Sequence, residues 1–251
     1  TDGGASWRPK PGLSSFGTAA FAISPSDSKI VLAAGFSGGT PDHDRVSGLY
    51  RTSNGGDSWT KVNNALYRPT HRAGTSPIAF VSASLVYAGD DSGKLWKSTD
   101  SGVTWQDVGT IGTAIWAVAS HPANANTLFI TTSLGLRKVV DNGTLTVAPL
   151  GNLPAAPRLL VMSPNTTADP LTLYATIRDN GIYRSTDSGA SFTQTNGGIS
   201  LPIVGGPVYL SISPVRGAQD LLYVSFGKPK AGTWWGEMYY SSDGASNWKK
   251  L

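Results

Sequence analysis

The sequence of 251 residues contains no cysteine, and Glu237 is the only glutamate among its 16 acidic residues. Without cysteine the chain has no disulfides, thiolate metal sites or cysteine nucleophiles. Aspartate favours turns whereas glutamate favours helices, so this imbalance favours a protein of strands and turns. No apolar run approaches the ~18 residues of a membrane-spanning helix, and no long segment has helical periodicity. We therefore expect an all-β chain without a membrane span.

Charged residues are also scarce, at 14% of the chain. The 20 Lys and Arg residues give a net charge of +4 but are scattered without a basic run, so nucleic acid is not an expected partner. Asn142 and Asn165 begin Asn-x-Thr sequons, which are glycosylation sites in secreted eukaryotic proteins. They favour a secreted, extracellular protein.

Glycine and proline are plentiful instead, at 30 and 16 residues, and one turn motif recurs six times. Its pattern is Ser/Thr-x-Asp-x-Gly-x-x-Trp, and its clean copies run over 98–105 and 185–192, the second with Phe192 in place of Trp. We call this motif the Asp turn. Its central residues are Asp2, Asn54, Asp100, Asp141, Asp187 and Asp243. Consecutive copies lie 41 to 56 residues apart, a period that indicates a repeat architecture.

The motif has a structural explanation. The Asp or Asn side chain accepts hydrogen bonds from nearby backbone N–H groups, and the Gly suits a backbone with positive φ. The Trp begins the next strand and can pack over its own hairpin, where burial of the ring contributes about 2–3 kcal/mol. We therefore assign the six Asp turns a structural role and no catalytic role.

Each repeat contains four strand signals. In the fourth repeat they fall at 158–163, 171–176, 181–185 and 191–195. Four strands in a unit of about 40–50 residues are typical of a β-propeller blade. The sequence therefore predicts one all-β propeller domain over 1–251, built of four-stranded antiparallel blades with Asp turns. A partial blade is expected at about 1–17, and five full blades at 18–63, 64–108, 109–148, 149–195 and 196–251. The cut copy of the motif at Asp2 predicts that the domain is part of a longer protein.

Asp turns repeated on propeller blades resemble the Asp-box, or bacterial neuraminidase repeat (BNR), superfamily. Its members include sialidases, xyloglucan-cleaving endoglucanases, reducing-end-specific cellobiohydrolases, sortilin-type receptors and non-catalytic propellers. The segment 181–189, Gly-Ile-Tyr-Arg-Ser-Thr-Asp-Ser-Gly, looks most like the xyloglucanase and photosystem-assembly branches. The resemblance covers nearly the whole chain and implies a propeller, but an Asp box does not specify a function.

Function is expected on the face opposite the Asp turns, which we call the loop face. It carries the loops between the second and third strands of each blade and the connections between blades. Glycoside hydrolysis needs two carboxyl groups about 5–10 Å apart, and the candidate catalytic residues are Asp42, Asp44, Asp90, Asp91 and Glu237. Aromatic and cationic side chains that can stack on sugars or bind hydroxyls are the candidate substrate-binding residues: Tyr67, Arg68, Arg178, Trp234 and Trp235. The two Trp residues are expected on a long loop of the fifth blade.

Three functions remain open. The first is a secreted carbohydrate-active propeller that binds a polysaccharide of the xyloglucan or β-glucan type and, as a candidate glycoside hydrolase, cleaves it if two carboxylates converge. The second is a non-catalytic lectin, adhesin or protein-interaction propeller, and the third is a sialidase. No metal or cofactor is expected. The expected partners are a polysaccharide or glycan and a second propeller or missing part of the same polypeptide.

Overall fold

The computed structural model describes residues 5–6, 17–36, 48–63, 77–199, 208–212, 217, 219–230 and 233–251. These residues form five four-stranded antiparallel sheets, each one blade of a β-propeller, so the predicted fold class is confirmed. The predicted partial blade at 1–17 lies almost entirely outside the described residues. No helix long and apolar enough to cross a membrane occurs in the described part of the chain.

The strands of each blade follow one another in chain order across the sheet. Blade 1 contains β1 (Gly17–Ile23), β2 (Val31–Phe36), β3 (Gly48–Thr52) and β4 (Thr60–Asn63). Blade 2 contains β5 (Ile78–Phe80), β6 (Val86–Gly89), β7 (Lys94–Ser98) and β8 (Gln106–Thr110). Blade 3 contains β9 (Ile115–Ser120), β10 (Thr127–Thr132), β11 (Gly135–Asp141) and β12 (Leu145–Leu150). Blade 4 contains β13 (Leu159–Met162), β14 (Leu173–Ile177), β15 (Gly181–Ser185) and β16 (Thr193–Gln194). Blade 5 contains β17 (Val208–Ile212), β18 (Leu222–Lys230), β19 (Thr233–Ser241) and β20 (Lys249–Lys250).

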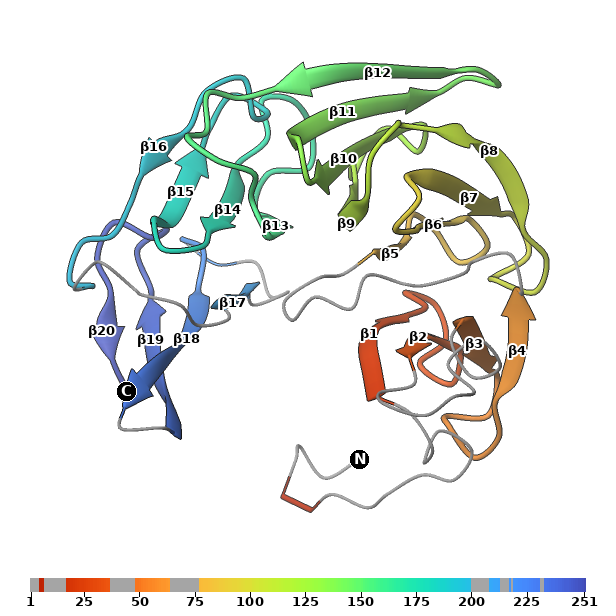
Figure 1. The fold of residues 1–251 in the computed structure, drawn as a ribbon, viewed down its shortest axis with the longest axis horizontal. Coiled ribbons are helices and arrows are strands. Elements are labelled where there is room, and N and C mark those ends of the chain that lie inside the picture. The colour runs from red at the N-terminus through yellow and green to blue at the C-terminus, as the bar shows by residue number, and fades with distance from the viewer. Residues whose placement is uncertain are drawn as a thin grey trace.

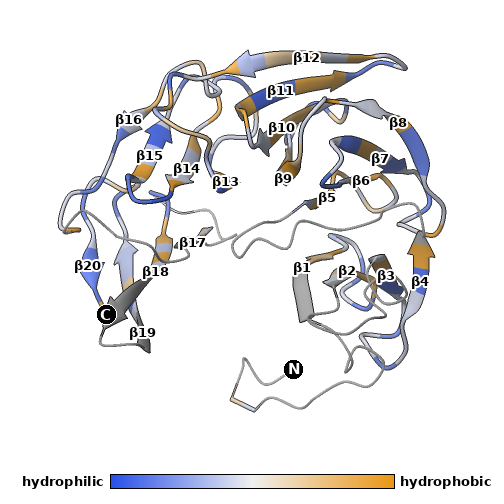
Figure 2. Ribbon diagram, viewed as in Figure 1, coloured by the Kyte–Doolittle hydropathy of each residue, from blue (hydrophilic) through white to orange (hydrophobic). Residues whose placement is uncertain are grey.

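The blades are arranged around an arc, with the first strand of each blade innermost (Figure 1). Inner strands of successive blades contact each other, from β1 with β5 to β13 with β17. Blades 1 and 5 lie at the two ends of the arc, on opposite sides of the view (Figure 1), and no comparable contact joins β1 to β17 among the described residues. The outermost strands β8, β16 and β20 are largely hydrophilic, whereas β9 is hydrophobic (Figure 2). The outer edges of blades 2, 4 and 5 are therefore hydrophilic, and the innermost strand of blade 3 is hydrophobic.

The Asp turns are closed by the same set of hydrogen bonds in four blades. In blade 2 the Asp100 carboxylate accepts from the Ser98 hydroxyl at 2.8 Å and from the Thr104 N–H at 2.8 Å. The Ser98 hydroxyl in turn accepts from the Gly102 N–H at 2.8 Å. Equivalent bonds close the turns centred on Asn54, Asp187 and Asp243. The Ser/Thr and Asp/Asn positions of the motif are thus a reciprocal pair that satisfies the turn's backbone donors.

The glycine of the Asp turn has a second role at the contact between blades. Gly102 has a φ of 85°, and a Cβ there would lie 2.7 Å from the Leu32 side chain of blade 1. Gly189 has the same φ, and a Cβ there would lie 2.8 Å from Leu150 of blade 3. Blade 5 has Ala245 at this position, with a φ of 70°. The motif therefore selects a small residue both for the turn conformation and for close approach to the preceding blade.

Acid is expected to weaken the Asp turns. Hydrogen bonds from the side chain and the backbone N–H of Ser191 lower the pKa of Asp187 to about 2. This value lies below the ~3.9 of an unfolded Asp, so the stabilisation is complete above about pH 4 and is lost as the pH falls towards 2. We expect the Asp187→Asn variant to fold well at pH 7, because Asn54 accepts the same hydrogen bonds in the turn of blade 1. The variant should also lose this acid sensitivity. Asp187→Ala should cost about 1 kcal/mol at pH 7.

Urea denaturation between pH 6 and pH 2 measures this effect, with Asp27→Asn on an exposed loop as the control. An acid dependence of Asp187→Asn as steep as that of the unsubstituted protein would refute the assignment.

Buried tyrosines link two pairs of neighbouring blades. The Tyr87 hydroxyl of blade 2 donates to Asp141 of blade 3 at 2.7 Å, and the Tyr174 hydroxyl of blade 4 donates to Asp220 of blade 5 at 2.7 Å. Both tyrosines are fully buried. Burial, and then the neighbouring carboxylate, raise the pKa of both phenols, which therefore stay protonated donors. We call each pair a Tyr–Asp latch.

Candidate functional site

The structure describes only part of the predicted site. Asp90, Asp91, Arg178 and Glu237 lie within the described residues. Asp42, Asp44, Tyr67 and Arg68 lie outside them, as does Asp2 of the first Asp turn. Trp234 and Trp235 belong to strand β19, but their side chains are not among those described.

The expected long loop of blade 5 is a β-hairpin instead. Strand β18 runs on to Lys230 and β19 begins at Thr233, with Trp235 paired to Lys228 and Trp234 to Pro229. The prediction of a loop at this place was wrong. Alternating pairs across two long strands satisfy the backbone groups that a loop would leave to water.

Asp90 lies at the end of β6 and is buried. One carboxylate oxygen accepts from the Ser92 N–H, the Ser92 hydroxyl and the Lys94 N–H at 2.7 to 3.0 Å. The other accepts from the Trp96 indole N–H at 3.2 Å. Its backbone carbonyl also accepts from the Ile115 N–H of blade 3 at 3.0 Å. This carboxylate therefore organises the β6–β7 turn of blade 2 and its contact with the next blade.

Replacing Asp90 tests whether it acts through structure. Asp90→Ala leaves the buried Trp96 indole N–H and the Lys94 N–H without their acceptor, and should destabilise the protein by about 2–3 kcal/mol. Asp90→Asn keeps an acceptor oxygen and should restore part of that loss. Thermal unfolding gives the stability of each variant. A loss of ligand binding or activity in Asp90→Ala with unchanged stability would instead place Asp90 in the reaction.

Arg178 and Asp91 lie in turns of blades 4 and 2. Arg178 lies in the β14–β15 turn of blade 4, and its Nε is 3.7 Å from the carboxylate of Asp179. Both side chains are about half exposed, at 54% and 50%, so part of each reaches the solvent on the loop face. Asp91 is half-buried in the β6–β7 turn of blade 2.

Glu237 occupies a strand position and contacts the outer strand of its own blade. Its carboxylate lies 2.9 Å from the Lys250 ammonium on β20 and accepts from the Tyr239 hydroxyl at 3.0 Å. Blade 2 has a similar cross-strand pair with the charges reversed, Lys94 with Asp107 at 2.7 Å. Glu237 thus pairs across the sheet as Lys94 does.

Two loop-face residues escaped the sequence reasoning. Trp116 lies near the start of β9, and the Arg158 guanidinium just before β13 stacks on its ring at 4.2 Å from the ring centroid. Both follow connections between blades, so they stand at the loop-face end of the innermost strands of blades 3 and 4. An aromatic or Arg residue at the first positions of an innermost strand is the signal that could have located them. Trp116 is only 6% exposed, so this cation–π contact holds blades 3 and 4 together at the loop face and leaves little of the ring to a ligand.

A polar cavity of about 420 Å³ lies on the opposite, Asp-turn side, between blades 2 and 3. Its lining includes Trp105, Gln106 and Asp107 of blade 2. The ion pair of Lys97 with Asp141, 2.8 Å long, crosses from blade 2 to blade 3 at its edge. Its size matches ordinary ligand sites, although the sequence did not predict a site there.

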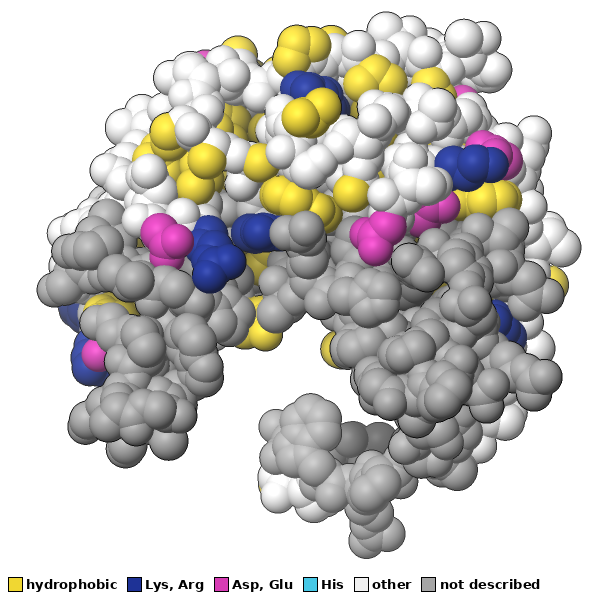
Figure 3. Space-filling view, in the orientation of Figure 1, with side chains coloured by type: hydrophobic (Ala, Val, Ile, Leu, Met, Phe, Trp, Pro, Cys, Tyr) yellow, Lys and Arg dark blue, Asp and Glu magenta, His cyan; other side chains and the backbone are white. Residues whose placement is uncertain are grey.

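Charged side chains on the face drawn in Figure 3 form small groups rather than one large field of a single sign in the described part of the chain. The described residues contain no cluster of three or more His, Asp or Glu side chains that could hold a metal ion.

Comparison with known proteins identifies the fold. A glycoside hydrolase family 74 (GH74) enzyme of Niastella koreensis matches 93% of the chain with a TM-score of 0.69 and 21% sequence identity. The GH74 xyloglucanase of Xanthomonas campestris matches 94% of the chain with a TM-score of 0.61 and 18% identity. YCF48 bound to a D1 peptide matches 99% with a TM-score of 0.62 and 16% identity. The chain shares the propeller fold of these proteins.

At these identities the likeness concerns the fold alone. The chain spans 38% of the length of each of these two GH74 chains and 72% of the YCF48 chain. No protein-family model matches the sequence, and no curated protein does.

Proposed function

We propose that this chain is an Asp-box propeller that binds a polysaccharide of the β-glucan or xyloglucan type on its loop face and acts outside the cell. The observation that carries the proposal is the fold shared with GH74 enzymes over more than nine-tenths of the chain. The recurring Asp turns support it, because the same hydrogen bonds close the turn in four blades, which is expected of a motif shared by a repeat superfamily.

The loop-face residues divide into binding and structural groups. Arg178 with Asp179 offers a charged pair to sugar hydroxyls, whereas Trp116 is buried and its stack with Arg158 joins blades 3 and 4. Asp90 and Glu237 already hold their own blades together. In this proposal binding is the primary activity, and any hydrolysis depends on Asp42 and Asp44.

A polysaccharide panel tests the proposal by affinity electrophoresis and by reducing-sugar release. Xyloglucan or a related β-glucan should retard the protein, and replacing both Trp234 and Trp235 by Ala should weaken binding roughly tenfold or more, since one stacked aromatic ring contributes about 1 kcal/mol. Gln106→Ala, at the cavity on the opposite side, is the matched control and should bind normally. If sugar is released, Asp42→Ala or Asp44→Ala should abolish release.

A second candidate function is the binding of a peptide. It rests on YCF48, a propeller recorded with a bound D1 peptide, whose chain this protein matches over 72% of its length, against 38% for the GH74 enzymes. Retardation by none of the polysaccharides, together with saturable binding of a peptide library, would favour this function and reject the first.

A further inference from the structure

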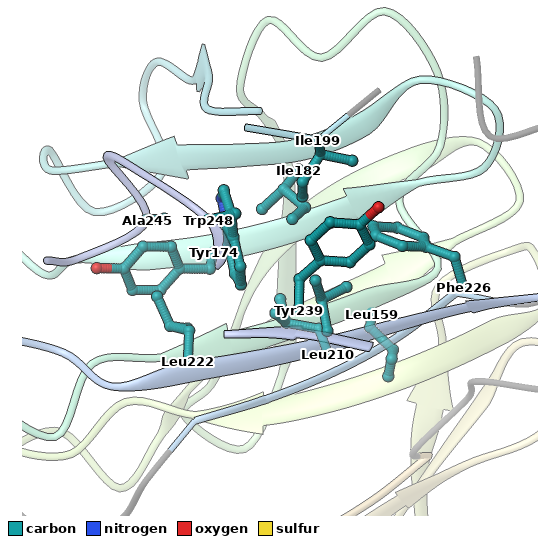
Figure 4. Packing of buried hydrophobic residues seen from close by; sticks show 11 residues of the cluster. Leu159, Tyr174, Ile182, Ile199, Leu210, Leu222, Phe226, Tyr239, Ala245 and Trp248 are labelled. Carbon is teal, nitrogen blue, oxygen red and sulfur yellow. The ribbon is translucent and has the colours of Figure 1, made fainter. Parts of the chain in front are cut away.

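One position of the Asp turn seals the contact between neighbouring blades. It lies five residues after the central Asp of the turn, and it is Trp105 in blade 2, Phe192 in blade 4 and Trp248 in blade 5. Each of these rings packs on the hydrophobic cluster that its blade shares with the preceding one. Trp248, for example, packs with Tyr174 and Ile182 of blade 4 (Figure 4). An aromatic ring therefore closes three of the four contacts between the described blades.

Blade 3 has no aromatic residue at this position. The residue there is Thr146, which is exposed, and the neighbouring Leu145 packs on the cluster of blades 2 and 3 instead. A Cβ at Gly109 on β8 would lie 3.1 Å from the Leu145 side chain. In the next contact a Cβ at Gly151, just after β12, would lie 3.0 Å from the Phe192 ring. Leu145 thus replaces the aromatic residue with a smaller side chain.

The polar cavity of about 420 Å³ lies at this same contact between blades 2 and 3. Its lining includes Trp105 and Val108 of blade 2 and Gly143 of the blade 3 turn. Val108 packs on the same hydrophobic cluster as Leu145. The space is therefore explained by the sequence: it lies where the other turns supply a ring and the turn of blade 3 does not.

The charged side chains of the lining are already paired. The Lys97 ammonium lies 2.8 Å from the Asp141 carboxylate. The Asp107 carboxylate lies 2.7 Å from the ammonium of Lys94. A charged ligand would have to compete with these pairs, whereas an uncharged ligand leaves them intact. The exposed amide of Gln106 also lines the cavity and can accept a hydrogen bond from a ligand N–H or O–H.

We propose that this cavity binds a small, uncharged aromatic ring that carries an N–H or O–H group, such as an indole or a phenol. The ring lies against Trp105 and Val108, in the place that the turn's own aromatic residue takes in the other contacts. A polar group on the ring has a precedent in blade 5, where the Trp248 indole N–H donates to the Thr195 carbonyl of blade 4 at 2.9 Å. The site is on the Asp-turn side and is separate from glycan binding on the loop face.

Calorimetric titration with indole and with phenol tests the proposal. The unsubstituted protein should bind indole with a Kd of about 1 mM or below. Leu145→Trp returns a ring to the blade 3 turn and should weaken this binding roughly tenfold or more. Leu145→Phe is a second variant with a smaller ring and should act in the same direction. Leu134→Trp, which adds an indole on an exposed turn, is the matched control and should bind indole normally.

Hydrogen–deuterium exchange locates the bound ring without any substitution. Indole should protect 99–108 and 141–143, the segments around the cavity, and should leave the loop face unchanged. Absence of saturable binding of both rings would overturn the proposal. So would protection by indole elsewhere only, or normal indole binding by both Leu145 variants when thermal unfolding shows that they are folded.

Two controls separate this proposal from glycan binding and identify the source of the ring. Retardation of Leu145→Trp by xyloglucan should equal that of the unsubstituted protein, so either proposal can fail without the other. N-acetyltryptophanamide presents the same indole as a peptide side chain. Its binding as tightly as indole would assign the ring to a peptide, whereas binding of indole alone would assign it to a free small molecule.

Discussion

Replacing Asp141 by alanine is expected to destabilise the protein by about 3–5 kcal/mol, the cost of removing one partner from a buried charged network. Asp141 is almost fully buried and accepts from the Tyr87 hydroxyl at 2.7 Å and the Lys97 ammonium at 2.8 Å, both from blade 2. Although burial opposes its ionisation, these two donors hold the pKa of Asp141 below its usual value. Without the carboxylate, Tyr87 loses its acceptor in the core and Lys97 loses its counter-ion.

The matched control is Asp100→Ala. Asp100 occupies the same position in its own Asp turn, but its carboxylate is exposed and bonds only within the turn. We expect a cost of about 1 kcal/mol there. Urea denaturation at pH 7 compares the two variants, and equal losses would show that the Tyr87–Asp141 latch contributes nothing beyond an ordinary turn.

Tyr174→Ala is expected to cost about 3–5 kcal/mol, since it removes a fully buried ring from the core between blades 4 and 5. Tyr174→Phe should cost less, about 1–3 kcal/mol, because the ring stays in place and the hydroxyl's interactions with Asp220 and Arg184 are lost. Ser163 and Asn165 still donate to that carboxylate, at 2.6 and 2.8 Å. Thermal unfolding of both variants against Leu134→Ala, on an exposed turn, gives the comparison. A Tyr174→Phe variant as stable as the unsubstituted protein would show that this latch is not needed.

The sequence was sufficient to predict the propeller because its turns and strands have local causes. The Asp, Ser/Thr and Gly of each turn satisfy one another within a few residues, and strand β15 occupies the predicted residues 181–185. Strand β16 starts at Thr193 rather than at the predicted residue 191, because Ser191 is still bonded to Asp187 in the turn. Local hydrogen bonding thus explains both the strand that was predicted correctly and the strand whose start was predicted too early.

The site was less predictable because its residues depend on contacts between blades. Asp90 was predicted as a candidate catalytic carboxylate, but its environment depends on Trp96 and on Ile115 of the next blade. The stack of Trp116 with Arg158 joins blades 3 and 4, 42 residues apart in the sequence. A local sequence pattern cannot show that residues of two different blades are in contact. The order of strands and loops could indicate a face of the propeller, but it could not identify which side chains on that face are already hydrogen-bonded within the protein.

Glycan binding on the loop face is the central claim, and hydrogen–deuterium exchange with and without a xyloglucan oligosaccharide tests it most directly. The account predicts protection at 90–93, 110–114 and 178–180, three described loops of that face, and none at 99–106 or 141–143 on the Asp-turn side. Protection confined to 99–106 and 141–143, or no protection with any β-glucan oligosaccharide, would contradict it.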